Sequence, residues 1–282
     1  MATIVDGNGL AREIRAEVSA SLSELVSQGH PAPCVAIVQI GEDPSASMYT
    51  RRLQKSFGDA GVRVEVRQLN AAVSATDAAG AVADLSRDPS IHGIQLQTPV
   101  PQQVSLAALL DALDPAKDLD GIHPTNAGLL AQGRPAIVPA TPLGGLEILL
   151  RHNIQIAGAR AVVVGRSTPV GRPMALLLLQ HDATVTVCHT KTRSLEAITA
   201  EADILAVAAG RAGMITDEMV RPGATVIDFG VSVVDGKAVG DVASSVAERA
   251  GLFTPVPGGT GPLTTAMLLR NMLQLYTSAL SR

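Results

Sequence analysis

The chain has 282 residues, of which 46% are hydrophobic and 17% charged, enough to bury one large core or two medium ones. A formal net charge of -4, 2% aromatic residues and no tryptophan argue against nucleic-acid and membrane-surface binding, which favour basic patches and stacking side chains. There are two cysteines, no Cys-x-x-Cys pair, no signal-length apolar run and no membrane-length apolar stretch. We therefore expect a soluble cytoplasmic protein without a disulfide framework or a bound metal.

Short β-branched runs alternate with Ala- and Leu-rich segments throughout the chain, which is typical of a parallel α/β fold. In the first half, strands are expected over residues 34–41, 62–69 and 91–99. A helix is expected from Pro44, because Asp43 is a good N-cap and proline suits the first helical position. A second helix is expected over 75–88, and residues 114–126 are rich in turn formers.

The second half predicts another α/β series. An amphipathic helix should follow residues 138–145, and strands are expected over 159–165, 183–189, 202–209 and 224–230. A final apolar-periodic helix follows the turn-rich segment 254–264. We predict two α/β lobes, residues 1–141 with 262–282 and residues 142–261, with the last helix returning to the first lobe.

The segment "VVVGRSTPVGRP" (162–173) suggests a dinucleotide site. A strand is followed by Gly165, five residues, Gly171 and a helix start, and glycine lets the backbone approach a pyrophosphate at a helix N-terminus. An ordinary tight βα turn is an equally good explanation of the glycine pair alone. The next strand ends at "CHTKT" without the acidic residue that holds an NAD ribose, and Arg166 lies in the glycine loop. This combination favours NADP over NAD.

Two further segments combine turn formers with polar groups. "KDLDGIHPTN" carries Asp118 and Asp120; it is more often a turn, although a carboxylate there could accept two N–H bonds from a flat amidine-like heterocycle. "IQLQTPVP" places Gln95 and Gln97 on one face of a strand, and buried glutamines need hydrogen-bond partners. The loop "TPVPGGTGP" is equally ambiguous between a rigid turn and a ligand-facing surface.

Together these segments resemble the methylenetetrahydrofolate dehydrogenase/cyclohydrolase family over nearly the whole chain. The matching motifs are "DPAKDLDGIHPTN", "VVVGRSTPVGRP", "CHTKT", "VIDFGV" and "TPVPGGTGPLT". The resemblance implies an N-terminal α/β folate-binding lobe, a Rossmann-like NADP-binding lobe, a folate cleft between them and a homodimer. It also implies a C-terminal helix that packs on the first lobe.

The resemblance assigns expected roles by position. Tyr49 matches the tyrosine that lies against the pterin, Gln97 the active-site glutamine, and Asp120 the carboxylate that binds the pterin amino edge. The expected cofactor residues are Gly165, Arg166, Ser167 and Gly171 in the loop, Thr190 near the 2′-phosphate and Val231 beside the nicotinamide. Pro257, Gly258 and Gly259 are expected to line the folate.

One position of the helix "SMYTRRLQK" departs from the family pattern. The family has Tyr-x-x-x-Lys, and that lysine carries the cyclohydrolase chemistry, whereas Leu53 stands four residues after Tyr49 here. Lys55 is about 240° around the helix from Tyr49, and Arg52 is a poor proton shuttle because its pKa exceeds about 12. The resemblance therefore implies a pterin platform without the usual base.

We expect NADP-dependent oxidation of 5,10-methylenetetrahydrofolate to 5,10-methenyltetrahydrofolate, with weak or absent cyclohydrolase activity. One alternative is an ordinary bifunctional enzyme that forms 10-formyltetrahydrofolate, with Lys55 or another donor supplying the proton transfers. A second alternative is a dehydrogenase that acts on a modified pterin or serves a specialised one-carbon pathway. Thr98 and Thr260 depart from the family's usual apolar residues beside the cleft and leave substrate preference open. A non-catalytic protein that binds folate or NADP for regulation is the alternative of another class.

Overall fold

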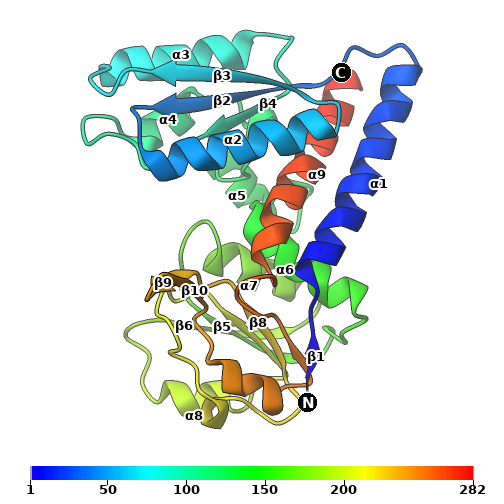
Figure 1. The fold of residues 1–282 in the computed structure, drawn as a ribbon, viewed down its shortest axis with the longest axis vertical. Helices are drawn as coiled ribbons and strands as arrows, with labels where there is room; N and C mark the ends of the chain where they lie inside the picture. The colour runs from blue at the N-terminus through cyan, green and yellow to red at the C-terminus, as the bar shows by residue number, and fades with distance from the viewer. Residues whose placement is uncertain (1, 282) are drawn as a thin grey trace. The chain divides into compact units, whose positions relative to one another are not determined.

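A computed structural model describes residues 2–281, which separate into two units (Figure 1). The first unit comprises residues up to 12, 130–134 and 139–267, and the second comprises 13–129, 135–138 and the chain from 268 onward. Helices α1 (Gly7–Ser27) and α9 (Gly261–Leu280) contribute residues to both units. Within residues 2–281, no helix has the length and apolar character that crossing a membrane requires.

A parallel three-stranded sheet, in the order β3-β2-β4, is the centre of the second unit. Alternate residues of the central strand pack against α3 and α4 in one apolar cluster, and hydrogen bonds join its Gln39 to Ser47 and Thr50 of α2. The elements of this unit are β2 (Cys34–Ile40), α2 (Pro44–Asp59), β3 (Arg63–Leu69), α3 (Ala75–Arg87), β4 (Gly93–Leu96), α4 (Leu106–Ala112), the 3-10 helix η1 (Pro115–Lys117) and most of α5 (Pro124–Ala131).

Local sequence signals explain where these elements begin and end. Helix α2 begins at Pro44 as predicted, and the Asp43 carboxylate caps it by accepting the Ala46 N–H at 2.9 Å. The strand expected over 91–99 is shorter, because β4 ends at Leu96. Proline, which has no N–H to donate, follows at position 99. Helices α1, α4 and α5 were not predicted from the sequence.

The last helix returns to the unit that contains β2, as predicted. The Asn271 side-chain amide donates to the carbonyls of Leu119 at 3.0 Å and Val138 at 2.9 Å. Tyr276 is fully buried, donates to the Pro31 carbonyl and contacts His92 edge-on at a ring separation of 5.0 Å. These contacts join segments far apart in sequence.

A six-stranded parallel sheet, in the order β1-β11-β8-β7-β5-β6, forms the first unit. The four strands predicted in the second half are all present as β5 to β8. The elements are β1 (Thr3–Ile4), α6 (Ala140–Arg151), β5 (Arg160–Val164), α7 (Gly171–Gln180), β6 (Thr184–Cys188), α8 (Leu195–Thr199), β7 (Ile204–Val207), η2 (Asp217–Met219), β8 (Thr225–Asp228), the hairpin β9 (Ser232–Val234) and β10 (Lys237–Val239), η3 (Ser244–Glu248) and β11 (Leu252–Phe253).

Helix α6 corrects one prediction. It begins at Ala140, inside the segment expected to precede it, and most of its residues are buried rather than divided between two faces. Gly144 and Gly145 permit this close packing: a Cβ at Gly145 would lie 2.4 Å from the Phe229 ring. Small residues therefore place this helix directly against neighbouring side chains.

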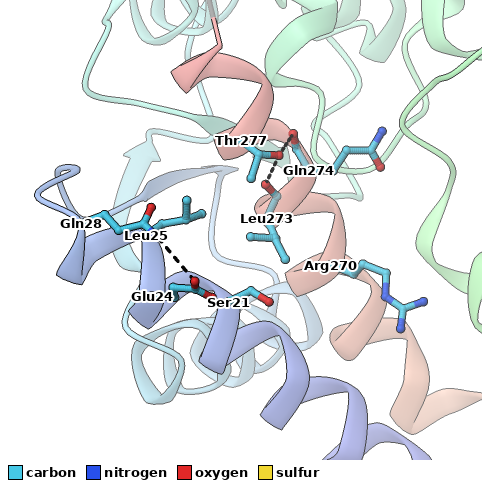
Figure 2. Close-up of a pocket in the computed structure, with 8 residues that line it drawn as sticks. All are labelled: Ser21, Glu24, Leu25, Gln28, Arg270, Leu273, Gln274 and Thr277. Carbon is cyan, nitrogen blue, oxygen red and sulfur yellow. Dashed lines mark hydrogen bonds between the residues drawn. The ribbon is translucent and has the colours of Figure 1, made fainter.

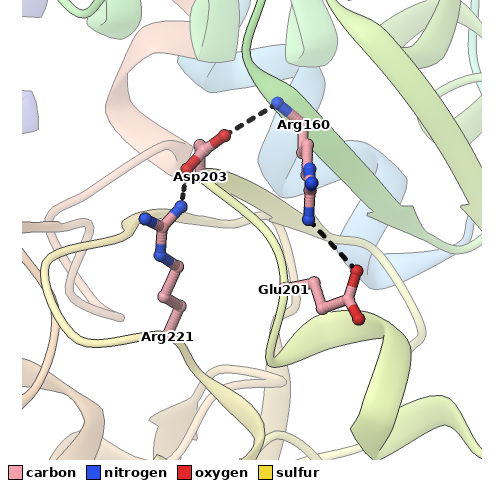
Figure 3. Close-up of polar contacts among 4 residues, drawn as sticks. All are labelled: Arg160, Glu201, Asp203 and Arg221. Atoms are coloured by element: carbon pink, nitrogen blue, oxygen red, sulfur yellow. Dashed lines mark hydrogen bonds and ion pairs between the residues drawn. The ribbon is translucent and has the colours of Figure 1, made fainter.

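Exposed charges join the starts of β5 and β7 (Figure 3). Asp203 accepts the Arg160 backbone N–H at 2.9 Å and an N–H from the Arg221 guanidinium, while Arg160 pairs with Glu201 at 3.3 Å. Ion pairs this exposed contribute about 0–1 kcal/mol each. The cluster lies at the ends of the strands opposite the glycine loop, so we interpret it as structural.

Two buried carboxylates organise the loops after β7 and β8. Asp241 is fully buried and accepts backbone N–H groups from Ala209, Gly210 and Arg211 at 2.6 to 2.8 Å. Asp228 accepts three further backbone N–H groups, including that of Asp241 itself at 3.1 Å. Burial raises the pKa of Asp228 to about 6, because the surrounding N–H groups only partly compensate for lost hydration.

Asp241→Asn is expected to lower the free energy of unfolding by about 3 kcal/mol. Its amide nitrogen would face backbone N–H donors that the carboxylate now satisfies. Urea unfolding measures the loss, with Asp217→Asn as the control because exposed Asp217 accepts one hydroxyl hydrogen bond from Ser245. Equal stability of the two variants would contradict this role for Asp241.

Candidate functional site

The site residues predicted from the sequence fall into two groups, one in each unit. Tyr49, Gln97 and Asp120 lie in the second unit, which contains β2 to β4. The glycine loop, Thr190, Val231 and the segment Pro257 to Gly259 lie in the first unit. Each group has its own geometry and is built by its own sheet.

The end of β4 brings Asp120 beside a glutamine. The Leu119 N–H donates to the Ile94 carbonyl at 3.1 Å, so the acidic segment runs alongside β4. The Gln95 side-chain nitrogen then donates to Oδ2 of Asp120 at 2.6 Å. This hydrogen bond joins Asp120, the carboxylate predicted to bind a ligand, to a strand residue that is 25 positions away in the sequence.

The two aspartates of this motif have different roles in the fold. Buried Asp118 accepts the His123 backbone N–H at 2.8 Å and the Asn126 side-chain N–H at 2.9 Å, so it holds the turn together. Asp120 has a pKa raised to about 7, first by desolvation and then by the negative charge of Asp118, although the Gln95 hydrogen bond lowers it. A carboxylate whose pKa is so perturbed is a candidate for ligand binding.

Tyr49 lies close enough to Asp120 for the negative charge of the carboxylate to affect the tyrosine hydroxyl. Its pKa is raised by desolvation and by the Asp120 carboxylate, against an opposing effect of Arg52. The hydroxyl is therefore protonated at neutral pH and available as a hydrogen-bond donor. The structure thus brings Tyr49 and Asp120 into one neighbourhood.

Two glutamine atoms of β4 and its continuation lack partners. Gln95 and Gln97 are buried, and within residues 2–281 neither Oε1 of Gln95 nor Nε2 of Gln97 has a hydrogen-bond partner. Buried amide atoms are normally satisfied by protein or water. These two atoms therefore offer one acceptor and one donor to a ligand.

Helix α2 does not present an amine on the Tyr49 face. Leu53 is fully buried, whereas the Lys55 side chain is 78% exposed and pairs with Asp59 at 2.8 Å. Arg52 is exposed. The helix therefore places a buried aliphatic side chain one turn after Tyr49.

In the first unit, the glycine loop connects β5 to α7. Gly165 has a φ of 128°, and a Cβ there would lie 2.2 Å from the Ala208 carbonyl oxygen. A Cβ at Gly171 would lie 2.3 Å from the Gly165 carbonyl oxygen, so neither glycine has room for a side chain. The Gly171 N–H donates to the Ser167 hydroxyl at 3.3 Å, which closes the loop.

The loop suits a phosphorylated dinucleotide. Arg166 and Ser167 are exposed beside the start of α7, where the positive end of the helix dipole favours anions. Thr190 and Lys191 are exposed just after β6, and no carboxylate occupies the "CHTKT" segment. These residues fit an anionic group on the ribose better than a free 2′-hydroxyl.

The remaining predicted residues lie in two loops of this unit. Val231 is 65% exposed and directly precedes the β9–β10 hairpin. The Gly258 carbonyl accepts the Gly7 N–H at 2.9 Å, and a Cβ at Gly259 would lie 2.4 Å from the Pro255 carbonyl oxygen. The Pro257 to Gly259 loop is therefore fixed by the backbone and not by its own side chains.

A separate groove lies between α1 and α9 of the second unit (Figure 2). It is open, has a volume of about 540 Å³, and none of the predicted site residues lines it. The lining residues are Ser21, Glu24, Leu25, Gln28, Arg270, Leu273, Gln274 and Thr277. Among residues 2–281, no cluster of His, Cys, Asp and Glu has the arrangement of a metal site.

Comparison with known families decides the assignment. Residues 5–120 match the tetrahydrofolate dehydrogenase/cyclohydrolase catalytic domain, and residues 139–280 match the NAD(P)-binding domain of the same family. The chain belongs to the tetrahydrofolate dehydrogenase/cyclohydrolase family. It is therefore an enzyme of that family, with a folate-type catalytic domain and an NAD(P)-binding domain.

Relatives match along their whole length. "Bifunctional protein FolD" of Chloroflexus aurantiacus is 54% identical over 96% of each chain. The crystal structure of the bifunctional FolD enzyme of Campylobacter jejuni superposes with a TM-score of 0.96 at 36% identity over 99% of each chain. The Trypanosoma brucei FolD structure, complexed with NADP and an inhibitor, has a TM-score of 0.92 at 34% identity over 100% of this chain and 99% of that one.

Gly165→Ala is expected to weaken binding of the nicotinamide dinucleotide by about tenfold or more and to lower the free energy of unfolding by about 3 kcal/mol. The added Cβ would collide with the Ala208 carbonyl at a positive φ. Gly158→Ala is the matched control, because its φ is 78° but no atom lies within 4 Å of its Cβ. Dinucleotide titration and urea unfolding check both effects, and equal losses in the two variants would refute the close approach.

The contact between Gln95 and Asp120 was not predicted from the sequence. The available signal was positional, because Gln95 shares a strand face with Gln97. Its partner could not be identified, since the pairing depends on the path of residues 118–120 beside β4. The structure therefore adds Gln95 to the candidate folate group, by which we mean the residues Tyr49, Gln97 and Asp120 of the second unit.

Proposed function

We propose that this protein is an NADP-dependent 5,10-methylenetetrahydrofolate dehydrogenase with weak or absent cyclohydrolase activity. The single observation that carries the proposal is the buried Leu53 one helical turn after Tyr49, with Lys55 exposed and paired to Asp59. The other polar groups of the folate side, Asp120 and Gln97, are present and buried or partly buried. The loss is therefore selective for the group that exchanges protons.

The dehydrogenase step requires alignment more than proton transfer. A hydride leaves the methylene carbon of the substrate, and the two adjacent folate nitrogens stabilise the resulting cation, so no proton has to be removed. Bound NADP would accept that hydride at its nicotinamide ring. Positioning alone can supply much of the rate, because well-aligned reactants reach large effective molarities.

In our proposal, each retained residue holds the folate in place. Asp120 accepts N–H groups from the pterin, Tyr49 lies against the ring, and Gln97 donates its unpaired N–H to the substrate. Pro257, Gly258 and Gly259 present a fixed backbone surface to the folate. None of these roles requires a side chain that titrates during hydride transfer.

The cyclohydrolase step is different because water must add to the cation and the ring must open. Both events move protons, and a positioned acid or base typically contributes about 10²–10⁴-fold. Leucine cannot do this, and Lys55 pairs with Asp59 on the exposed side of α2. Hydrolysis should therefore be much more impaired than hydride transfer.

The bifunctional alternative is favoured by the names of the relatives, among them "Bifunctional protein FolD". This alternative requires a proton donor, which Leu53 cannot supply. Tyr49 is the nearest titratable group on the same helix face. A non-catalytic folate- or NADP-binding protein is the remaining alternative. It predicts binding of both ligands without reduction of the dinucleotide.

The preference for NADP rests on the exposed Arg166, Thr190 and Lys191 and on the lack of a carboxylate in the segment "CHTKT" (188–192) at the end of β6. The NADP complex of the Trypanosoma brucei relative supports the same choice. Arg166, Ser167 and Gly171 would hold the phosphates, and Val231 would lie beside the nicotinamide. The homodimer and the cytoplasmic location stay predictions.

The test is an absorbance assay with 5,10-methylenetetrahydrofolate and either NADP or NAD. We expect reduction of the dinucleotide with formation of the methenyl product, and a clear preference for NADP. Tight binding of both ligands without reduction would overturn the proposed function in favour of the regulatory alternative. Equal use of NAD would overturn only the cofactor preference.

A further inference from the structure

Gln95 is a buried side chain in which, among the described residues, one of the two polar atoms is hydrogen-bonded and the other is not. It is 4% exposed, and its Nε2 donates to Asp120 Oδ2 at 2.6 Å. Its Oε1 is buried and has no partner within residues 2–281. By contrast, the buried Gln39 on β2 accepts a hydrogen bond from Thr50 and donates one to Ser47, each at 2.8 Å.

We propose that Gln95 is a positioning and specificity residue of the folate group: it orients Asp120 through Nε2 and accepts an N–H of the bound heterocycle through Oε1. This inference rests on the proposed function, because it assumes that Asp120 binds the pterin. It adds to that function a second acceptor beside the carboxylate. The ligand edge that fits both acceptors is a planar heterocycle with at least two adjacent N–H donors.

The orientation of the amide follows from its partner. An ionised Asp120 can only accept hydrogen bonds, so the nitrogen of Gln95 must face it and the oxygen must face elsewhere. Because β4 side chains alternate between faces, that oxygen lies on the same side of the strand as Gln97. The buried donor of Gln97 and the buried acceptor of Gln95 therefore belong to one polar surface.

The charges around Asp120 define what removal of Gln95 should do. Asp118 and the Tyr49 hydroxyl lie near the carboxylate, and Arg52 lies near Tyr49. Among the described residues, Gln95 is the side chain that donates a hydrogen bond to the Asp120 carboxylate. Without it, protonation of Asp120 becomes easier, so its pKa rises.

Gln95→Met keeps the length of the side chain but removes both the donor and the acceptor. We expect tetrahydrofolate binding, measured by calorimetry, to weaken about tenfold or more, since hydrogen bonds to charged groups are among the stronger ones. KM for 5,10-methylenetetrahydrofolate should rise more than kcat falls. The acid limb of kcat/KM should also move to higher pH, which mere loosening of the fold would not cause.

Gln68→Met is the matched control, because exposed Gln68 on β3 donates to the Gly41 carbonyl rather than to Asp120, at the same distance of 2.6 Å. It should leave tetrahydrofolate affinity and the pH profile unchanged. Gln95→Glu is a second variant, in case the methionine variant does not fold. Its carboxylate would repel Asp120 once both are ionised, so the loss of affinity should grow as pH rises.

Each outcome separates this inference from the proposed function. Normal wild-type turnover with unchanged affinity and pH profile in both Gln95 variants would overturn the role of Gln95 alone. Failure of the wild-type protein to bind tetrahydrofolate would overturn the proposed function and this inference with it. Wild-type binding without turnover would overturn the dehydrogenase proposal, and calorimetry on the variants would still decide the role of Gln95.

Discussion

Asp120→Asn is expected to lower kcat/KM for 5,10-methylenetetrahydrofolate by about a hundredfold or more. The carboxylate can accept two N–H groups from the pterin, whereas the amide offers one acceptor and opposes the remaining N–H with its own. Gln95 Nε2 donates to Oδ2 of Asp120 at 2.6 Å. In the variant, Gln95 and the pterin would therefore compete for the one oxygen of the asparagine amide. Steady-state kinetics with saturating NADP measures the loss.

The pH dependence gives this prediction a sharper form. Asp120 has a pKa raised to about 7, so below that pH it is increasingly protonated and one acceptor becomes a donor. Wild-type kcat/KM should therefore fall as pH drops through about 7, and the low residual activity of Asp120→Asn should lack this acid limb. Asp111→Asn, at an exposed position of α4, should keep both the rate and the limb. An unchanged limb in Asp120→Asn would assign it to another group.

The same shift has a consequence for stability, with the opposite sign. Because the folded pKa of Asp120 lies above the value of 3.8 for a free side chain, the folded state binds more protons between about pH 4 and 7. Ionised Asp120 therefore costs stability as pH rises through this window. The function that we propose needs the ionised form, so the site accepts a destabilised carboxylate in return for ligand binding.

Leu53→Lys is expected to raise cyclohydrolase activity by about 10²–10⁴-fold while changing dehydrogenase activity much less. Leu53 is fully buried on the same face of α2 as Tyr49, so a lysine there would place an amine near the folate group. Burial would lower the pKa of that amine and make it a better proton shuttle at neutral pH. The rate of disappearance of 5,10-methenyltetrahydrofolate measures the gain.

Two controls separate this effect from general disturbance of α2. Leu53→Met should leave both activities unchanged, because the volume is nearly conserved and no proton donor is added. Lys55→Ala should also have no effect on hydrolysis, since that amine pairs with Asp59 on the exposed side of the helix. Loss of residual hydrolysis in Lys55→Ala would show that Lys55 supplies the proton transfers, contrary to the account.

Much of the fold could be predicted from local patterns, because parallel strands in α/β proteins are short, β-branched and separated by helices. Strands β2, β3 and β5 to β8 lie where the apolar runs indicate. The two-residue strands β1 and β11 could not be predicted, since their pairing joins the N-terminus to a distant segment. Helix α6 was expected after residue 145, but it begins at Ala140 and includes Gly144 and Gly145, which permit close packing.

The candidate site was less accessible to sequence reasoning than the fold. A helical wheel was enough to separate Leu53 from Lys55, because both lie on one regular helix. The contacts of His92 could not be predicted from spacing, because its ring accepts the Cys34 N–H at 3.1 Å and contacts Tyr276, which is far away in sequence. The contact between Gln95 and Asp120 was missed for the same physical reason, since it depends on a crossing of two segments and not on spacing.

The decisive measurement is the initial rate at which the wild-type enzyme hydrolyses 5,10-methenyltetrahydrofolate, compared in the same buffer with its rate of NADP reduction. We expect rapid reduction of NADP and hydrolysis close to the uncatalysed rate, because α2 presents buried Leu53 and no amine on the Tyr49 face. Hydrolysis as fast as hydride transfer would overturn the proposed loss of cyclohydrolase activity.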